Sequence, residues 1–276
     1  MAKVSLRLGD LTLEGESRAG DETWFRVHPS GVAFDAGRGA LPLAGAERLF
    51  LSHGHLDHAL GVPFLLSQRT LHAAGDTRVY CPARIANDLE RLVRAASRLE
   101  QVDYRASIEP LAAGDRVEVG RRLLVEAFAT DHVVPSLGYH LIERRRRLAE
   151  PYRELASEEI ATRRRAGEEV EEEREVVRLT YCGDTGPGVF SDEPKLFDAH
   201  VLLLECTFVG SAARDKGRQF GHLHIEDIVE QADRFANRHL VLHHLSRRFR
   251  RPELRAEIDR LLPGLAERVH IWGERR

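Results

Sequence analysis

The sequence predicts an α/β fold in a single domain, and three observations lead to that class. Its 276 residues suit one large domain, and 42% of them are apolar, which is enough to fill a core. Short apolar runs typical of strands recur along the whole chain, with amphipathic helical segments between them. Neither a short internal repeat nor a linker rich in proline and glycine divides the chain. We therefore expect residues 1–276 to form one domain.

The first part of the chain is predicted to begin with strands and then to alternate strands with helices. Residues 4–39 look like short strands and turns, and residues 46–52 form a candidate buried strand. A helix is expected over 61–71, where a proline stands near the first turn. A strand at 77–82 and an amphipathic helix at 83–97 follow.

The second part returns to strands and ends with two helices among them. The expected strands cover 104–111, 115–120, 122–130, 137–143, 175–184, 199–208, 239–246 and 268–272. The expected helices cover 224–237 and 251–263. This order of elements supports the α/β class.

Residues 143–175 interrupt this pattern with a dense run of charge. They hold nine arginines and eleven acidic residues, with few apolar positions. We expect a charged, partly helical, arm-like insertion here. Its arginine clusters at 144–147 and 163–165 could bind phosphates, and a solvated charged surface without a ligand is an equally good interpretation.

Composition excludes several classes of protein. The formal net charge of −3 does not suit a general nucleic-acid binder, so any basic surface must be local. The three cysteines show no paired spacing, which argues against a disulfide framework and favours the cytoplasm. No signal peptide and no apolar run of about 20 residues is present, so we expect a soluble protein without a membrane partner.

Polar residues able to bind a metal follow the apolar runs at their carboxyl ends. Five separate runs lead into His53, His132, Asp184, Glu205 and His244. Strand ends along one edge of a sheet are where α/β folds gather their binding groups. Five repetitions of this pattern predict one shared functional site.

The stretch "LSHGHLDH" adds His55, Asp57 and His58 to this set. Imidazole nitrogen and carboxylate oxygen suit zinc, and also manganese or iron. The metal ligands expected from the sequence are His53, His55, Asp57, His58, His132, Asp184 and His244. Seven ligands suffice for two ions about 3.5–4 Å apart, the spacing of hydrolytic sites with two metals. Because side chains alternate along a strand, only one of His243 and His244 can face the metals, and we favour His244.

Several motifs carry a resemblance to a known family. The segment "HGHLDH" (53–58) resembles the HxHxDH signature of the metallo-β-lactamase superfamily, and "GVPFLLSQR" after it resembles the ribonuclease Z version. Further segments agree in order: "DHVVPSLGY" (131–139), "YCGDTGP" (181–187), "LLLECTF" (202–208), "GHLHIEDI" (221–228) and "HHLSRRF" (243–249). The resemblance covers about residues 48–250.

This resemblance implies a four-layer αββα sandwich with two Zn²⁺ ions per chain, or Mn²⁺ or Fe²⁺ in their place. It implies that one ion is held by His53, His55 and His132, the other by Asp57, His58 and His244, and that Asp184 bridges them. A water between the ions would be the nucleophile, oriented or deprotonated by Asp57.

The family pattern also implies roles beyond the metals. Glu205 and His222 would form a pair in which His222 protonates the leaving 3′ oxygen, with His224 as the competing candidate. Arg248 would contact a phosphate of the substrate near the metals.

The substrate implied by the family is precursor tRNA, whose 3′ trailer is removed by endonucleolytic cleavage, and a homodimer is implied in the same way. The chain departs from the family at "FDAGRG" (34–39), at "HLHI" (222–225) and in the arm, which lacks a tip rich in glycine and proline. Two alternatives therefore stay open. One is a hydrolase of the same fold acting on a small phosphodiester or ester, and the other is a non-catalytic relative that binds RNA or a protein partner.

Overall fold

The computed structural model describes residues 4–210 and 214–274 and contains two seven-stranded sheets. The first sheet holds, in spatial order, β1 (Val4–Leu8), β2 (Leu11–Arg18), β3 (Glu22–His28), β4 (Val32–Phe34), β5 (Arg48–Phe50), β6 (Thr77–Pro82) and β7 (Ala106–Leu111). Its first four strands pair antiparallel, and β4 to β7 pair in parallel. The outer elements of this half are η1 (Leu41–Gly45), α1 (Leu56–Ala59), α2 (Val62–Leu71) and α3 (Ala83–Glu100).

The second sheet has the same combination of antiparallel and parallel pairing. Its strands are β8 (Arg116–Gly120), β9 (Leu123–Ala129), β10 (Leu137–Leu148), β11 (Glu171–Tyr181), β12 (Val201–Glu205), β13 (His239–His243) and β14 (Val269–Ile271). Strands β8 to β11 pair antiparallel and β11 to β14 pair in parallel. Its helices are α5 (Val189–Asp192), η3 (Pro194–Asp198), α6 (Arg214–Phe220), α7 (Ile225–Val229), η5 (Ala232–Arg234) and α8 (Arg251–Leu261).

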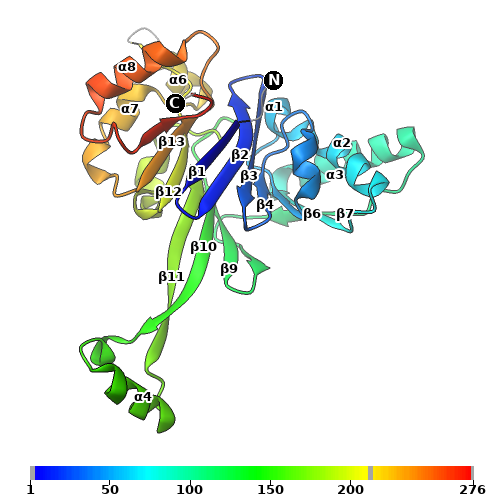
Figure 1. The fold of residues 1–276 in the computed structure, drawn as a ribbon. Coiled ribbons are helices and arrows are strands. Elements are labelled where there is room, and N and C mark those ends of the chain that lie inside the picture. Colours follow the sequence, from blue (N-terminus) through cyan, green and yellow to red (C-terminus); the bar gives the residue numbers. More distant parts are fainter. Residues whose placement is uncertain (1–3, 211–213, 275–276) are drawn as a thin grey trace.

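Three apolar clusters hold the layers together. The central cluster lies between the sheets, where Phe25 and Phe34 meet Tyr181 with ring centroids 5.7 and 5.0 Å apart. A second cluster packs α8 on the outer face of one sheet, and a third packs α2 and α3 on the other. Helices therefore cover both outer faces (Figure 1), which confirms the four-layer αββα sandwich.

Residues 143–175 lie mostly in a long hairpin that projects from the sandwich (Figure 1). Strands β10 and β11 continue into this stretch, and η2 (Glu150–Tyr152) and α4 (Ser157–Arg165) form its tip. The cluster 144–147 pairs in register with residues 172–175, so Arg144 stands opposite Glu175 and Arg147 opposite Glu172. Cross-strand pairs of opposite charge stabilise an extended hairpin. More of residues 143–175 is therefore strand, and less is helix, than the sequence predicted.

Several predicted elements are shorter in the structure, and for two of them the contacts give the reason. The helix expected over 224–237 is wrong beyond Val229, because Phe235 turns inward against Phe197 with ring centroids 5.1 Å apart. Asn237 also turns inward, and its side-chain amide donates to the carbonyls of Leu196 and Ala199 at 2.8 and 2.7 Å. The strand expected over 239–246 ends at His243, since His244 has a φ of 56°. None of the described helices combines the length and the apolar character needed to cross a membrane.

Candidate metal centre

The predicted metal ligands meet where the two sheets end side by side. His53 and His55 follow β5 of the first sheet, and Asp57 and His58 lie in the short helix α1. The remaining ligands His132, Asp184 and His244 follow β9, β11 and β13 of the second sheet. Both sheets contribute to this one shared site, because the sandwich brings their carboxyl-terminal strand ends together.

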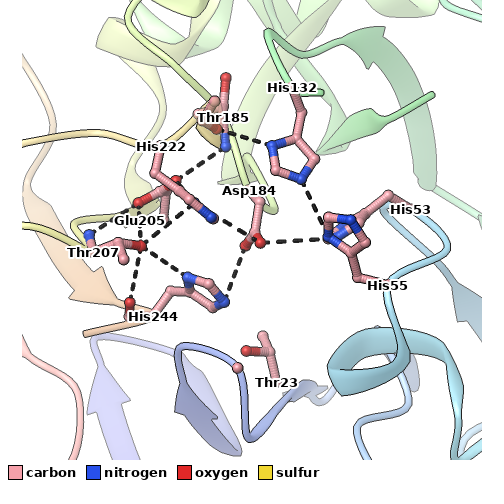
Figure 2. Close-up of polar contacts among 12 residues, drawn as sticks. Thr23, His53, His55, His132, Asp184, Thr185, Glu205, Thr207, His222 and His244 are labelled. Carbon is pink, nitrogen blue, oxygen red and sulfur yellow. Dashed lines mark hydrogen bonds and ion pairs between the residues drawn. The ribbon is translucent and has the colours of Figure 1, made fainter. Parts of the chain in front are cut away.

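Three histidines gather on one side of Asp184. Nδ1 of His55 lies 3.0 Å from Nε2 of His53 and 3.4 Å from Nε2 of His132. Oδ2 of Asp184 lies 3.7 Å from Nε2 of His53. Figure 2 shows Asp184 between this group and the ring of His244.

A second group faces the other oxygen of the same carboxylate. Oδ1 of Asp184 lies 3.4 Å from Nε2 of both His58 and His244, and these two nitrogens are 3.4 Å apart. Oδ2 of Asp57 completes the group at 3.7 Å from His58 and 3.6 Å from His244. Asp184 thus presents one oxygen to each group.

These groups fit metal coordination. Four ligand atoms placed tetrahedrally about 2.0–2.1 Å from an ion would be about 3.3 Å apart, close to the separations above. The donors are imidazole nitrogens and carboxylate oxygens, the set that suits zinc, iron and manganese. Oδ1 of Asp184 is buried and has no hydrogen-bond donor in the described part of the chain. A cation between these atoms would satisfy a buried charge that the described residues leave without a donor.

The outer nitrogens of two ligands in the first group are held by hydrogen bonds. The Ser52 hydroxyl donates to Asp35 at 2.8 Å and accepts from Nδ1 of His53 at 2.9 Å. Nδ1 of His132 donates to the carbonyl of Gly221 at 2.9 Å. With Nδ1 as the donor, Nε2 of both rings carries the free lone pair that faces the centre.

The second group is oriented in the same way. Nδ1 of His58 donates to Oδ2 of Asp35 at 2.7 Å, and Nδ1 of His244 donates to the Thr207 hydroxyl at 2.9 Å. Thr207 in turn donates to Oε2 of Glu205 at 2.8 Å. Each ring is therefore fixed before any ion binds, which lowers the cost of forming the site.

Asp35 is a functional residue that the sequence reasoning missed. It is fully buried and accepts hydrogen bonds from His58, from Ser52 and from the hydroxyl of Tyr181. A signal was present, because the run "GVAF" leads into Asp35 just as other apolar runs lead into ligands. Asp35 has a φ of 54°, in the left-handed region that aspartate adopts more readily than most residue types, and this turns the chain at the strand end.

Burial and neighbouring charges shift the pKa values of the titratable groups in different directions. Burial lowers the pKa of His53 well below its usual value, and it also lowers the pKa of His132. Burial opposes the charge on His58 as well, but Asp184 and Asp35 outweigh it and raise its pKa well above the usual value. Burial likewise opposes ionisation of Asp184, yet His244 and His58 hold its pKa well below the usual range. The centre thus contains a carboxylate that is ionised at neutral pH.

A separate pair lies beside the ligands. Nδ1 of His222 is 2.7 Å from Oε1 of Glu205, which is fully buried, and 4.0 Å from Oδ2 of Asp184. Burial lowers the pKa of His222, but the charge and hydrogen bond of Glu205 prevail and raise it to about 9. The His222 side chain keeps 15% of its surface exposed, so it can meet a substrate.

The structure separates the histidines that the sequence left as alternatives. His224 is buried at the start of α7, where Nδ1 accepts from the amide of Glu226 at 3.2 Å and Nε2 bonds to the carbonyl of Gly210 at 3.0 Å. His243 points to the other face of β13, where its ring stacks on Tyr181 with centroids 5.6 Å apart. Geometry therefore favours His222 over His224 and His244 over His243.

Arg248 lies apart from this cluster. Its side chain is exposed, and within the described residues it has no hydrogen bond or ion pair with a predicted ligand. The phosphate contact expected for Arg248 stays a prediction.

Known proteins resemble this chain over most of its length. The sequence matches the Beta-lactamase superfamily domain over residues 35–245, a range that includes every predicted ligand. The protein named tRNase Z TRZ1 of Arabidopsis thaliana is 30% identical over 270 residues, covering 97% of this chain and 96% of that protein. Among solved structures, human tRNase Z, short form, gives a TM-score of 0.61 at 19% identity over 95% of each chain. A diphosphatase from the PhnP family gives 0.60 at 14% identity over 95% of this chain and 93% of that one.

Proposed function

Because this chain belongs to the β-lactamase superfamily of metal-dependent hydrolases and, within it, to the tRNase Z (ribonuclease Z) family, we propose that it removes 3′ trailers from precursor tRNA by endonucleolytic cleavage. The observation that carries this proposal is the position of His222. Its ring lies beside Asp184 at the centre of the ligand cluster, with a buried carboxylate behind it. A proton donor next to a metal cluster is the arrangement that hydrolysis of a phosphodiester needs.

We propose that the centre holds two zinc ions, with manganese or iron able to replace them. His53, His55 and His132 would hold one ion, Asp57, His58 and His244 the other, and Asp184 both. Two cations bound there would lower the pKa of a shared water and withdraw charge from the phosphate.

The protein's own residues would complete the reaction. His222 holds its proton at neutral pH because Glu205 raises its pKa, and it would donate that proton to the leaving 3′ oxygen. Asp57 would orient the attacking water or accept its proton. Its Oδ2 accepts from the amide of Gly20 at 3.0 Å, and that bond fixes the carboxylate in place.

We propose that the projecting hairpin at 143–175 is the arm of a single hydrolase domain spanning 1–276. The arm contains exposed Arg164 and Arg165 and half-buried Arg163 near the end of α4, and these side chains could meet the phosphates of a large substrate. Arg163 and Arg164 pair with Glu168 and Glu171, so the positive charge available at this tip is limited.

We further propose a homodimer that works in the cytoplasm. Leu56, Leu60 and Phe64 follow one another at intervals of four residues across α1 and α2, and all three are exposed. An apolar stripe of this kind would be covered by a second copy of the chain. Light scattering on purified protein tests this proposal: a dimeric mass supports it, and a monomer at micromolar concentration contradicts it.

The three cysteines are free and buried, as a reducing compartment allows.

The test of function compares wild type with His53→Ala on a precursor tRNA that carries a 3′ extension. We expect wild type alone to cut just after the discriminator base. A metal-loaded wild type that leaves the precursor intact but hydrolyses a generic aryl phosphodiester would move the function to a small substrate. A wild type without bound metal and without either activity would favour the non-catalytic alternative.

A further inference from the structure

A cavity next to the metal centre has no part in the chemistry proposed above. It has a volume of about 460 Å³ and lies between the end of β2, the segment after His244, the start of α8 and Trp272. Four arginines line it: Arg18, Arg247, Arg250 and Arg251. We refer to it as the arginine cavity.

The arginine cavity and the metal centre share a wall. Ser17, which lines the cavity, accepts a hydrogen bond from the amide of the ligand His244 at 3.0 Å. Three residues further along the same turn, the amide of Gly20 donates to Oδ2 of the predicted ligand Asp57 at 3.0 Å. An RNA strand whose phosphodiester lies at the metal centre can therefore reach the arginine cavity within a few nucleotides.

The charge in the cavity is not balanced by its own acidic neighbours. Arg247 pairs with Asp21 at 2.6 Å, and Arg18 approaches the same carboxylate at 3.9 Å. Among the described residues, Arg250 and Arg251 form no ion pair within 4.0 Å. Arg251 acts electrostatically on Glu16 without forming an ion pair with it. Two guanidinium groups are thus available for an anion.

The remaining lining combines serines and aliphatic side chains with two aromatic rings, Phe249 and Trp272. Phe249 forms a half-buried part of the wall. Trp272 is 2% exposed and also lines the cavity, and its Nε1 has no hydrogen-bond acceptor in the described part of the chain. Because Nε1 is itself buried, Trp272 contributes ring surface to the wall and no exposed donor.

We propose that the arginine cavity binds one nucleotide unit of the RNA substrate, with its phosphate on Arg250 and Arg251 and its base against Phe249. This inference rests on the proposed function. Arginine presents a planar fork that fits phosphate, and bases stack on aromatic and guanidinium faces without regard to sequence. The volume lies within the range of roughly 300–1,000 Å³ that small-molecule sites occupy.

The test measures RNA binding in a metal-loaded His222→Ala background, which keeps all seven predicted ligands. The test variant is Arg250→Ala/Arg251→Ala. Its matched control is Arg91→Ala/Arg94→Ala, which removes the same charge from exposed positions of α3. With a labelled precursor tRNA, we expect the test variant to bind at least tenfold more weakly and the control to bind within twofold of the background. The slope of log affinity against log salt should fall by about 0.7 for the lost phosphate contact.

Equal affinities of the test variant and the control would overturn the proposal. Thermal unfolding checks that the variants fold, and the single change Arg250→Ala offers a second route, because this side chain is exposed and forms no ion pair with the described residues. We expect at least threefold weaker binding from this single change, and an affinity equal to that of the background would count against the cavity.

Free AMP separates failure of the cavity from failure of the proposed function. If wild type neither binds nor cuts precursor tRNA, the proposed function fails, and calorimetry with AMP then decides the cavity. If AMP binds to wild type but not to Arg250→Ala/Arg251→Ala, the conclusion that the cavity is a nucleotide site stands. No AMP binding to wild type, or equal binding to both proteins, removes the site.

Discussion

Nδ1 of His222 lies 2.7 Å from Oε1 of Glu205, and the carboxylate has no exposed surface. The Glu205 carboxylate is held in turn by the amides of Thr185 and Thr207, at 3.2 and 3.0 Å. These bonds hold Glu205 from behind and keep its Oε1 against His222. The pair therefore keeps a proton on His222 at a pH where a free histidine would have lost it.

The pH dependence of cleavage should reveal this pair. The pKa of His222 is raised to about 9, so its protonated form persists at neutral pH and is lost as the pH rises through that value. In Glu205→Gln the raising charge is gone, and we expect the alkaline limb of the profile of kcat against pH to move down by at least one unit. At pH 8, kcat should fall by about twofold or more, since a smaller fraction of His222 would then carry the proton.

Measurement of kcat on precursor tRNA between pH 6 and 10 checks this prediction. Glu226→Gln serves as the control, because that residue lies near His224 rather than His222. An alkaline limb that stays in place in Glu205→Gln would show that His222 does not supply the proton.

Metal affinity should depend on Asp35, although Asp35 does not face the ligand cluster. Its Oδ2 accepts from Nδ1 of His58 at 2.7 Å and fixes the ring that presents Nε2 to the centre. We expect Asp35→Asn to lower metal affinity by about 10–100-fold. Competition with a chelator of known affinity measures this change.

The matched control for Asp35→Asn is Tyr181→Phe. That change removes another hydrogen bond to the Asp35 carboxylate and leaves His58 its partner. If both variants lose metal equally, the effect comes from general damage around Asp35 and not from the orientation of His58.

Neutralising two glutamates of β11 in the arm should leave the facing arginines with fewer ion pairs. Arg144 lies 2.7 Å from Glu118 and 3.5 and 3.8 Å from Glu175 and Glu173, so the two arm carboxylates offset part of its charge. We expect Glu173→Gln/Glu175→Gln to strengthen binding of precursor tRNA several-fold at low salt, with a steeper salt dependence. The free energy of unfolding should change by less than about 1 kcal/mol, because these pairs are exposed. Unchanged RNA affinity would show that this part of the arm does not approach the substrate.

The free energy of unfolding should vary with pH through Glu126, which lies far along the chain from the motif at 53–58. Burial opposes its ionisation, but Lys195 and Arg116 bond to it and lower its pKa below the usual value of 4.5. A lowered pKa in the folded state adds stability above pH 4.5, and this stability is lost as the pH falls through the folded value. Urea unfolding should therefore find Glu126→Gln less stable than wild type by about 1 kcal/mol at pH 7. The difference should shrink near pH 3, and a constant difference would contradict this origin.

The sequence predicted which side chains gather at the centre, because the signals for them are local and repeated. His53, His55 and His58 lie within six residues, and His132 and Asp184 each follow an apolar strand. Apolar periodicity also located nearly every strand and helix of the layers.

The parts that could not be predicted depend on contacts between distant residues. Asp35 acts through a hydrogen bond to His58, and no spacing in the sequence announces such a partner. The long pairing of β10 with β11 runs through charged residues, which carry no apolar period. The helix beyond Val229 was expected because helical spacing continues there, but contacts of Phe235 and Asn237 with the core override it.

The metal content of the purified chain tests the central claim most directly. Elemental analysis of wild type, prepared without added chelator, should find about two equivalents of zinc, iron or manganese per chain. A His58→Ala/His244→Ala protein that remains folded should retain about one equivalent, held by the group of His53, His55 and His132. A folded wild type with no stoichiometric metal, even after incubation with zinc, would contradict the account.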